Sequence, residues 1–388
     1  MHARFWLALT LVACGDPQDP TLQTTEIAQE LSHADRREAR RLFEEETFGG
    51  NGRTCRTCHS LENGTLTLPQ IAEAFADDPH GPLFRGDGTD DGQGHGTDRI
   101  RSEGTVRVTL PLPAHVRLAD DPTARTVTLN RGIPTTLDTP ALDPVLMYDG
   151  RAADLIEQAR GAIADHTGTA VQPTADQLAL IAAFQQTRGF FTSNQTRKFA
   201  EGEDAPELPR GHTAAQRRGR RFFESVPISP DSKVGLCAIC HSGPLLNTSN
   251  GFNPLPPPLG FVPAGERFQS ILSGELLPGS NPPRTYIVTQ PDGSEVEVVS
   301  SDPGRALVTG DFRGFPLGHL GQFKIPSLRG IRDTAPYFHN GAAQTLEEVL
   351  QHYTTFFIIA TPVVFPGTAP IVLTPDDQAD IIAYLRLL

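Results

Sequence analysis

Two cysteine-histidine motifs constrain this chain more than any other feature of its sequence. The first, CRTCH, runs from Cys55 to His59, and the second, CAICH, runs from Cys237 to His241. This spacing is the attachment signature of c-type haem: the two thiols form thioethers with the porphyrin and the histidine becomes an axial ligand of the iron. We therefore expect two covalently bound haem c groups, haem 1 and haem 2. Their expected attachment residues and proximal iron ligands are Cys55, Cys58 and His59 for haem 1, and Cys237, Cys240 and His241 for haem 2.

Two other uses of paired cysteines have to be weighed against haem. Two Cys-x-x-Cys pairs can together form a four-cysteine zinc site, and one pair can act as a thioredoxin-like dithiol. The histidine after each pair favours haem, and so does an export signal, because covalent haem assembly takes place outside the cytoplasm. The fifth cysteine is Cys14, so two haem motifs leave no cysteine for a structural disulfide.

The N-terminal segment predicts export. Residues 1–14 (MHARFWLALTLVAC) combine a basic Arg4 with an apolar run that is too short to span a bilayer as a helix. The end of this segment, LVAC, resembles the bacterial lipoprotein signal, in which the cysteine carries the lipid. The alternative is an ordinary signal peptide in which Cys14 is incidental. We expect a periplasmic protein that touches a membrane only through a lipid on Cys14.

The chain also repeats itself in order, which predicts a duplication. The matching blocks are RRLFEEE (40–46) and RRFFES (220–225) before the motifs, YDGRAADLIEQA (148–159) and HNGAAQTLEEVL (339–350) after them, and the closing segments 175–187 and 376–388. The last two blocks of each half carry apolar residues at helical spacing. We expect a mainly α fold of two tandem cytochrome-c-like haem domains, residues 33–200 and 205–388.

Two segments outside the repeat read as β-hairpin insertions. TVRVTLPLP (105–113) and RTVTLN (125–130) alternate like paired strands, and 284–300 has Pro-Asp-Gly between two β-prone runs. The formal net charge of −13 argues against a nucleic-acid partner, because phosphate binding needs a basic surface. An acidic surface suits a basic protein partner, although most acidic surfaces are simply solvated.

A longer resemblance builds on these motifs. KIPSLRGIRDTAPYFHNGAAQTLEEVLQHY (324–353) resembles the signature of the bacterial di-haem cytochrome c peroxidases and of their relative MauG, and 133–163 is similar to the matching block of the first domain. The resemblance begins near Ala39. The segment 61–131 is longer than in the relatives, so the resemblance gives no expectation for it. It implies that hydrogen peroxide reacts at haem 1, with electrons relayed through haem 2 from a small donor cytochrome or cupredoxin.

The resemblance also implies distal residues at haem 1. The distal glutamine of the family falls on Gln158, whereas its distal glutamate falls on Gly168, which has no acid or base. Asp165 and His166 lie nearby, and His166 is the expected substitute.

Two further first-half residues are candidates. Arg151 is expected to order its loop or to pair with a haem propionate. In some peroxidases a mobile loop carries a distal histidine for haem 1, and the best match here is His95 in GQGHGTD.

At haem 2, the distal methionine of the peroxidases falls on Tyr353. MauG has a tyrosine at the corresponding place, and a phenolate ligand favours ferric and higher oxidation states of the iron. The chain has two methionines, Met1 and Met147, and neither is at this position. His352 is an alternative ligand, but adjacent helical residues point about 100° apart, so His352 should face away if Tyr353 faces the iron.

The resemblance also implies two features between the haems, and this chain matches each of them only in part. Tyr148 occupies the place of an interhaem tryptophan and is a candidate relay for a hole. A calcium ion would find carbonyl groups at Thr334 and Pro336, but Gly132 replaces its asparagine ligand, with Asn130 close by.

Three functions follow. The leading one is a di-haem peroxidase. The second is a MauG-like oxidase of a protein or organic substrate, which Tyr353 favours. The third is a non-catalytic electron-transfer lipoprotein in which both irons have two fixed axial ligands.

Overall fold

The structure is a computed structural model that describes residues 31–169, 171–224, 233–247, 267–364 and 366–388. The predicted signal segment and Cys14 lie outside these residues. The helices are α1 (His33–Glu44), α2 (Cys55–Cys58), α3 (Leu68–Asp77), α4 (Asp98–Glu103), α5 (Thr139–Leu142), α6 (Leu155–Thr167), α7 (Ala175–Phe184), α8 (Asn194–Ala200), α9 (Ala214–Arg220), α10 (Ser273–Leu276), α11 (Ala306–Thr309), α12 (Leu346–Val364) and α13 (Pro375–Leu385). The strands are β1 (Thr105–Pro111), β2 (Val116–Leu118), β3 (Thr126–Gly132), β4 (Phe268–Gln269), β5 (Arg284–Thr289), β6 (Glu295–Ser300) and β7 (Phe323–Lys324). The described part of the chain is thus mainly helical, and none of its helices is both long and apolar enough to cross a membrane.

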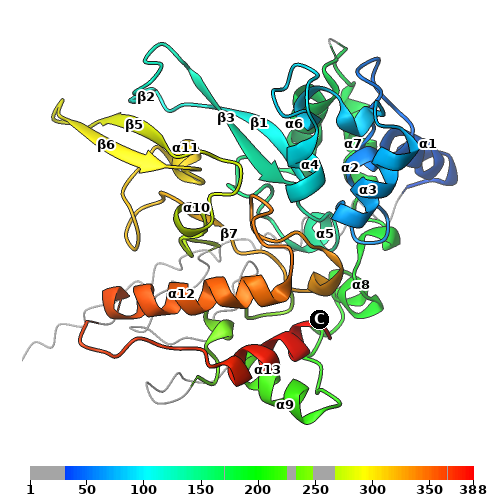
Figure 1. Cartoon of the computed structure of the whole chain (residues 1–388). Helices are drawn as coiled ribbons and strands as arrows, with labels where there is room; N and C mark the ends of the chain where they lie inside the picture. Colours follow the sequence, from blue (N-terminus) through cyan, green and yellow to red (C-terminus); the bar gives the residue numbers. More distant parts are fainter. Residues whose placement is uncertain (1–30, 170, 225–232, 248–266, 365) are drawn as a thin grey trace, which may run out of the picture.

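A pair of packed helices encloses each haem motif in the sequence. α1 packs on α7 in the first half, and α9 packs on α13 in the second (Figure 1). A small residue stands at the same place in both N-terminal helices: Ala39 is fully buried in α1, and Gly219 lies in α9, four residues before Phe223. A Cβ on Gly219 would lie 1.9 Å from the carbonyl oxygen of Asp380 in α13, so only glycine permits this close crossing.

The Asp/Asn-Gly blocks of the two halves form matching turns. Isolated antiparallel bridges join Leu146 to Ala152 in the first and Tyr337 to Ala343 in the second. Each turn is followed by a helix, α6 or α12, that starts at the leucine expected from the repeat. The Asp154 side chain accepts a hydrogen bond from the Glu157 backbone N–H and so caps the start of α6.

Both predicted strand pairs are present, and a third strand links them. β1 pairs antiparallel with β3, and β5 pairs antiparallel with β6. The chain between β1 and β3 contains β2, which leaves the first half and pairs with β5 of the second half, Leu118 opposite Tyr286. The second sheet therefore has the order β2-β5-β6, and the two insertions are one structural unit.

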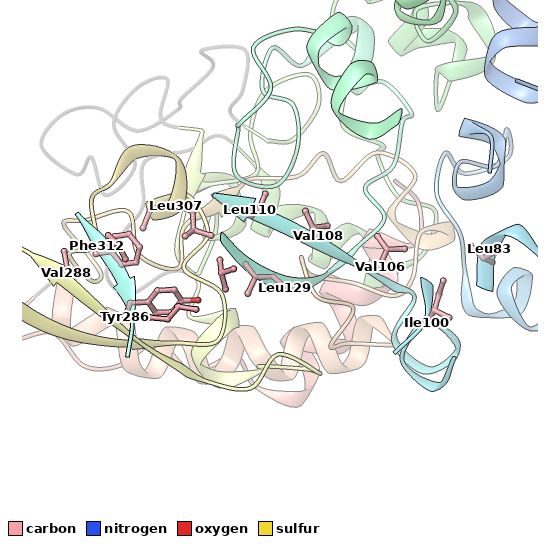
Figure 2. Packing of buried hydrophobic residues seen from close by; sticks show 14 of the residues in the cluster. Leu83, Ile100, Val106, Val108, Leu110, Leu129, Tyr286, Val288, Leu307 and Phe312 are labelled. Carbon is pink, nitrogen blue, oxygen red and sulfur yellow. The ribbon is translucent and has the colours of Figure 1, made fainter. Parts of the chain in front are cut away.

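Three hydrophobic clusters form the core. One belongs to the first half around Phe43 and Ile181, and another to the second half around Phe223 and Ile381. The third contains residues from α3, α4 and strands of both halves, and Figure 2 shows it between the two insertions. Its labelled members are Leu83, Ile100, Val106, Val108, Leu110, Leu129, Tyr286, Val288, Leu307 and Phe312. The halves thus share a core in addition to the one that each encloses.

A buried ion cluster also crosses between the halves. The Arg131 side chain, at the end of β3, donates from Nε and Nη2 to the Asp302 carboxylate, both at 2.8 Å, and from Nη1 to Asp149 at 2.5 Å. All three side chains are at most 2% exposed. Burial alone would raise the pKa of Asp302, but the charge and hydrogen bonds of Arg131 outweigh it and hold that pKa below its usual value.

Candidate active site

Both haem motifs hold their histidine in the same way. The His59 Nδ1–H donates to the Gly64 carbonyl oxygen at 2.8 Å, and the His241 Nδ1–H donates to the Leu246 carbonyl oxygen at 2.8 Å. A carbonyl oxygen only accepts, so each Nδ1 carries the proton and each Nε2 has a free lone pair. This is the arrangement in which a histidine ligates a metal while its second nitrogen is anchored.

One continuous cavity reaches both motifs. Its lining includes Cys58, His59, Cys237, Cys240 and His241 together with residues from α6 and α12. The two cysteine pairs do not come together as a zinc site would require, because no cluster of three or more His, Cys, Asp or Glu side chains suited to a metal occurs among the described residues, which include these four cysteines. The residues present therefore fit two c-type haem groups.

Burial keeps the haem-site groups neutral in this protein. It raises the pKa of Cys55 to about 12 and that of Cys58 to about 11, where Arg53 opposes the rise, so both are protonated thiols before any haem is attached. Burial lowers the pKa of His241 to about 4, against the opposing effect of its hydrogen bond to Leu246. The imidazole is therefore in the neutral form that a metal needs.

Tyr353, in α12, faces His241. The Tyr353 Oη lies 3.5 Å from the His241 Nε2, and both residues line the cavity. The neighbouring His352 points elsewhere: its Nε2 donates to the Ile271 carbonyl oxygen at 2.8 Å. Of the two adjacent side chains it is therefore Tyr353 that lies beside His241, and its role as a ligand of haem 2 stays a prediction.

One side of α6 forms part of the cavity wall. Leu155, Gln158, Ala162 and His166 line the cavity, and their spacing of three or four residues puts them on one helical face. Asp165 is exposed on another face, so it does not compete with His166 for the distal position. Gly168 is the left-handed C-cap residue of α6, with φ 64°, which explains a glycine there.

His166 is held by a residue from the segment 61–131. At the first motif, burial lowers the pKa of His59, and its hydrogen bond to Gly64 acts in the opposite direction. The His166 Nδ1 lies 2.5 Å from Asp87 Oδ2, and Arg53 contacts the other oxygen of Asp87. Sequence reasoning missed Asp87 and Arg53, and no local motif distinguishes either of them.

The other first-half candidates are placed as follows. The Arg151 Nη1 donates to both carboxylate oxygens of Asp149, at 3.0 and 3.1 Å, so it orders its turn while also lining the cavity. Tyr148 lines the cavity, and burial raises its pKa well above the usual value, which keeps the phenol protonated. His95 is 83% exposed, pairs with Asp91 at 2.6 Å and does not line the cavity. The structure therefore does not bring His95 to haem 1.

The calcium site stays a prediction. Thr334 and Pro336 line the cavity and offer carbonyl oxygens. The Asn130 side chain does not join them, because its amide nitrogen donates to Ser280 at 3.0 and 3.1 Å.

The chain is similar to several known proteins. The model of a family described as RoxA-like, cytochrome c-like matches residues 322–355. A cytochrome c551 peroxidase of Nitrosomonas europaea is 25% identical over 244 residues, which cover 56% of each chain. The cytochrome-c peroxidase IdrP1 of Denitromonas iodatirespirans is 28% identical over 224 residues, 54% of this chain and 48% of that protein. The chain spans about half the length of the curated relatives it matches.

Two solved structures are similar over most of their length. A MauG-like protein associated with microbial copper homeostasis has a TM-score of 0.49 and 20% identity, covering 92% of this chain and 89% of that one. The diheme peroxidase BthA from Burkholderia thailandensis has a TM-score of 0.47 and 17% identity, covering 92% and 86%. In sequence, the chain is thus similar to bacterial cytochrome c peroxidases over about half of its length.

Proposed function

We propose that the protein is a di-haem c-type peroxidase that reduces hydrogen peroxide at haem 1. The observation that carries this proposal is the pair of polar side chains, Gln158 and His166, on the cavity-facing side of α6 in the cavity that also contains His59. A glutamine amide and an imidazole are groups that can polarise the O–O bond of peroxide and move its proton.

The roles of the chain's own residues follow from their chemistry. When bound, the haem supplies an iron that takes up the peroxide oxygen and the electrons that cleave the O–O bond. His59 Nε2 holds haem 1 from the proximal side. The Gln158 amide can donate a hydrogen bond to peroxide, and the His166 Nε2 can accept and return a proton. Electrons reach haem 2 from a small donor cytochrome or cupredoxin, and Tyr148 lies in the cavity wall between the two motifs.

Tyr353 supports a second candidate, a MauG-like oxidase of a protein or organic substrate. With Tyr353 Oη 3.5 Å from His241 Nε2, a phenolate ligand would stabilise oxidised haem 2. Such a haem stores an oxidising equivalent more readily than it delivers electrons from a donor. This candidate uses the same distal groups at haem 1.

We also propose export to the periplasm, with a lipid on Cys14 as the membrane anchor. The basic residue and short apolar run of residues 1–14 support this proposal. Mass spectrometry of the mature protein tests it, because a lipid-modified N-terminal Cys14 is expected, and an unmodified N-terminus elsewhere contradicts it.

One optical experiment tests the function. Oxidised holoprotein is mixed with a small excess of hydrogen peroxide and reduced cytochrome c, and both the donor and the di-haem spectrum are followed. Rapid donor oxidation over many turnovers is the expected result. A long-lived high-valent spectrum with slow donor oxidation would identify the MauG-like oxidase. If neither signal changes, in the oxidised or the half-reduced protein, the electron carrier is the correct function.

A further inference from the structure

Asp87 contacts His166, a side chain that lines the same cavity as His59. Its Oδ2 lies 2.5 Å from His166 Nδ1, and the two side chains are 13% and 24% exposed. Burial alone would raise the pKa of Asp87, but the hydrogen bond to His166 and the charge of Arg53 lower it, so the group is a carboxylate. A carboxylate only accepts hydrogen bonds, so the Nδ1 carries the proton and the Nε2 keeps its lone pair.

The loop that carries Asp87 is built to hold it. Gly86 has φ 52°, in the left-handed region, and a Cβ on Gly88 would lie 2.1 Å from the Leu83 carbonyl oxygen. The Arg53 guanidinium donates to the carbonyl oxygens of Pro82 at 2.8 Å, Leu83 at 2.9 Å and Arg85 at 2.6 Å. Arg53 is 2% exposed and lies two residues before Cys55, so this loop is fixed to the first haem motif.

The end of α6 is fixed to the same region. The Asn51 backbone N–H donates to the Thr167 carbonyl oxygen at 2.8 Å, and its side-chain amide donates to the His166 carbonyl oxygen at 3.0 Å. The backbone of His166 and its ring are therefore held by separate partners, and both are attached to residues 51–53. Among the described residues, the His166 ring has a hydrogen-bond partner at Nδ1 but not at Nε2.

We propose that Asp87 is a positioning residue that makes the His166 Nε2 the proton-transfer atom of haem 1. The inference rests on the proposed peroxidase function. Nε2 would take the proton from one peroxide oxygen and give it to the other, which leaves as water when the O–O bond breaks. Two electrons from the donor and two protons from solvent complete the reduction of one peroxide to two waters. The carboxylate stabilises the transiently protonated imidazole.

This pair gives a role to the long insertion of residues 61–131. Gly168 stands where the family resemblance places a distal glutamate, and as a left-handed cap it has no side chain to offer. The insertion instead brings the Asp87 carboxylate to His166, so the carboxylate acts as the partner of a histidine. The acid–base group and its orienting carboxylate thus come from two segments that the sequence does not place together.

Cyanide tests the proton transfer without turnover. Hydrogen cyanide must lose its proton before it binds iron as the anion, so a distal base speeds its association with ferric haem. We would measure cyanide association by stopped-flow absorbance in the holoprotein and its variants. His166→Gln is expected to slow it roughly 100-fold or more. Asp87→Asn is expected to slow it about 10- to 100-fold, because an amide can donate to Nδ1 as well as accept and no longer fixes the tautomer.

The double variant separates positioning from a structural role. If Asp87 acts through His166, Asp87→Asn combined with His166→Gln is no slower than His166→Gln alone. Asp87→Glu, which keeps a carboxylate, should recover part of the parent rate, and it replaces Asp87→Asn if that variant does not fold. Asp91→Asn is the matched control, because it removes the carboxylate of another Asp–His pair, with His95, that does not line the cavity. Its cyanide rate should equal that of the parent.

Each outcome decides between the inference and the function on which it rests. The inference is overturned if the rate reductions of Asp87→Asn and His166→Gln multiply in the double variant. It is also overturned if the cyanide rate of His166→Gln lies within threefold of the parent. A parent that binds cyanide with the expected variant pattern but does not turn over peroxide would overturn only the peroxidase function. A parent whose haem 1 binds no cyanide has no open distal face, and then both are wrong.

Discussion

At the scale of single residues, the two halves use similar anchors but different distal groups. His59 and His241 each donate from Nδ1 to the carbonyl oxygen five residues later. Their other cavity-lining candidates differ: α6 carries Gln158 and His166, whereas α12 carries Tyr353. Similar anchors beside different polar groups would suit the division of labour that we propose for the two haems.

The ligand assignment at haem 2 gives the first prediction. Tyr353→Phe removes the oxygen that lies 3.5 Å from His241 Nε2, so the absorption spectrum of haem 2 should change. Its reduction potential should rise by on the order of 0.1 V, within the roughly 0.8 V range that axial ligands span. Redox titration followed by absorbance measures both. His352→Gln is the control, since His352 bonds to Ile271, and its haem 2 spectrum should match the parent. An unchanged spectrum in Tyr353→Phe would remove the ligand assignment.

Sequence alone reached those site residues that lie within a motif or a repeat. The orientations of Tyr353 and His352 followed from helical geometry, and both histidine ligands followed from their cysteine spacing. Asp87 was out of reach because a glycine-rich loop carries no signal for the helix it will meet. The expectation of His95 at haem 1 rested on flexible glycines around it, but the turn instead pairs His95 with Asp91 at the surface.

At the scale of elements, the repeated helix pairs position the helices that line the cavity. α7 holds α6 in the first half, and α13 packs on both α9 and α12 in the second. The repeat and its apolar periodicity predicted the closing helices α7 and α13, and the structure shows that Thr174 and Thr374 cap them in the same way. The strand β2 was not predicted, since three residues carry too little pattern and its partner lies far along the chain.

The second prediction concerns the crossing of α9 and α13. Gly219→Ala should destabilise the fold by about 1–3 kcal/mol, because the new Cβ would lie 1.9 Å from the Asp380 carbonyl oxygen and the helices must move apart. Urea unfolding of the holoprotein measures the change. Gly161→Ala in α6 is the matched control, because nothing lies within 4 Å of its Cβ. That variant should be as stable as the parent or up to about 1 kcal/mol more stable. Equal effects of the two substitutions would contradict the close crossing.

At the scale of the whole molecule, the β-rich insertions join the halves more firmly than a linker could. The shared cluster draws Val108 and Leu129 from the first half and Tyr286 and Val288 from the second. The Arg131 cluster adds a buried cation with carboxylates from both halves. Composition and repeats predicted two halves. They did not predict the shared hydrophobic cluster or the Arg131 ion cluster, because both consist of contacts between segments that are distant in the sequence.

The third prediction tests this union. Asp302→Asn leaves part of the Arg131 charge uncompensated in the interior and should lower the free energy of unfolding by about 3 kcal/mol at pH 7. The pKa of Asp302 lies below its unfolded value, so its stabilisation is present above about pH 4 and is lost as the pH falls through the folded pKa. Urea unfolding at pH 7 and at lower pH should therefore show the difference between parent and variant shrinking on acidification.

A surface pair provides the comparison. Asp311→Asn removes the partner of Arg313, which is 73% exposed, and should cost about 0–1 kcal/mol. If Asp302→Asn lowers the free energy of unfolding as little as Asp311→Asn does, the Arg131 cluster contributes little to holding the halves together.

The pairing of β2 with β5 bears on how the protein is made. Chain synthesis proceeds from the N-terminus, so β2 emerges long before the strand that completes its hydrogen bonds. The first half cannot finish folding until most of the second has appeared, and such non-local pairing forms slowly. We expect this delay to keep the first haem motif accessible while its thiols are still to be joined to the porphyrin. The order of events on the growing chain would then be attachment first and closure of the sheet second.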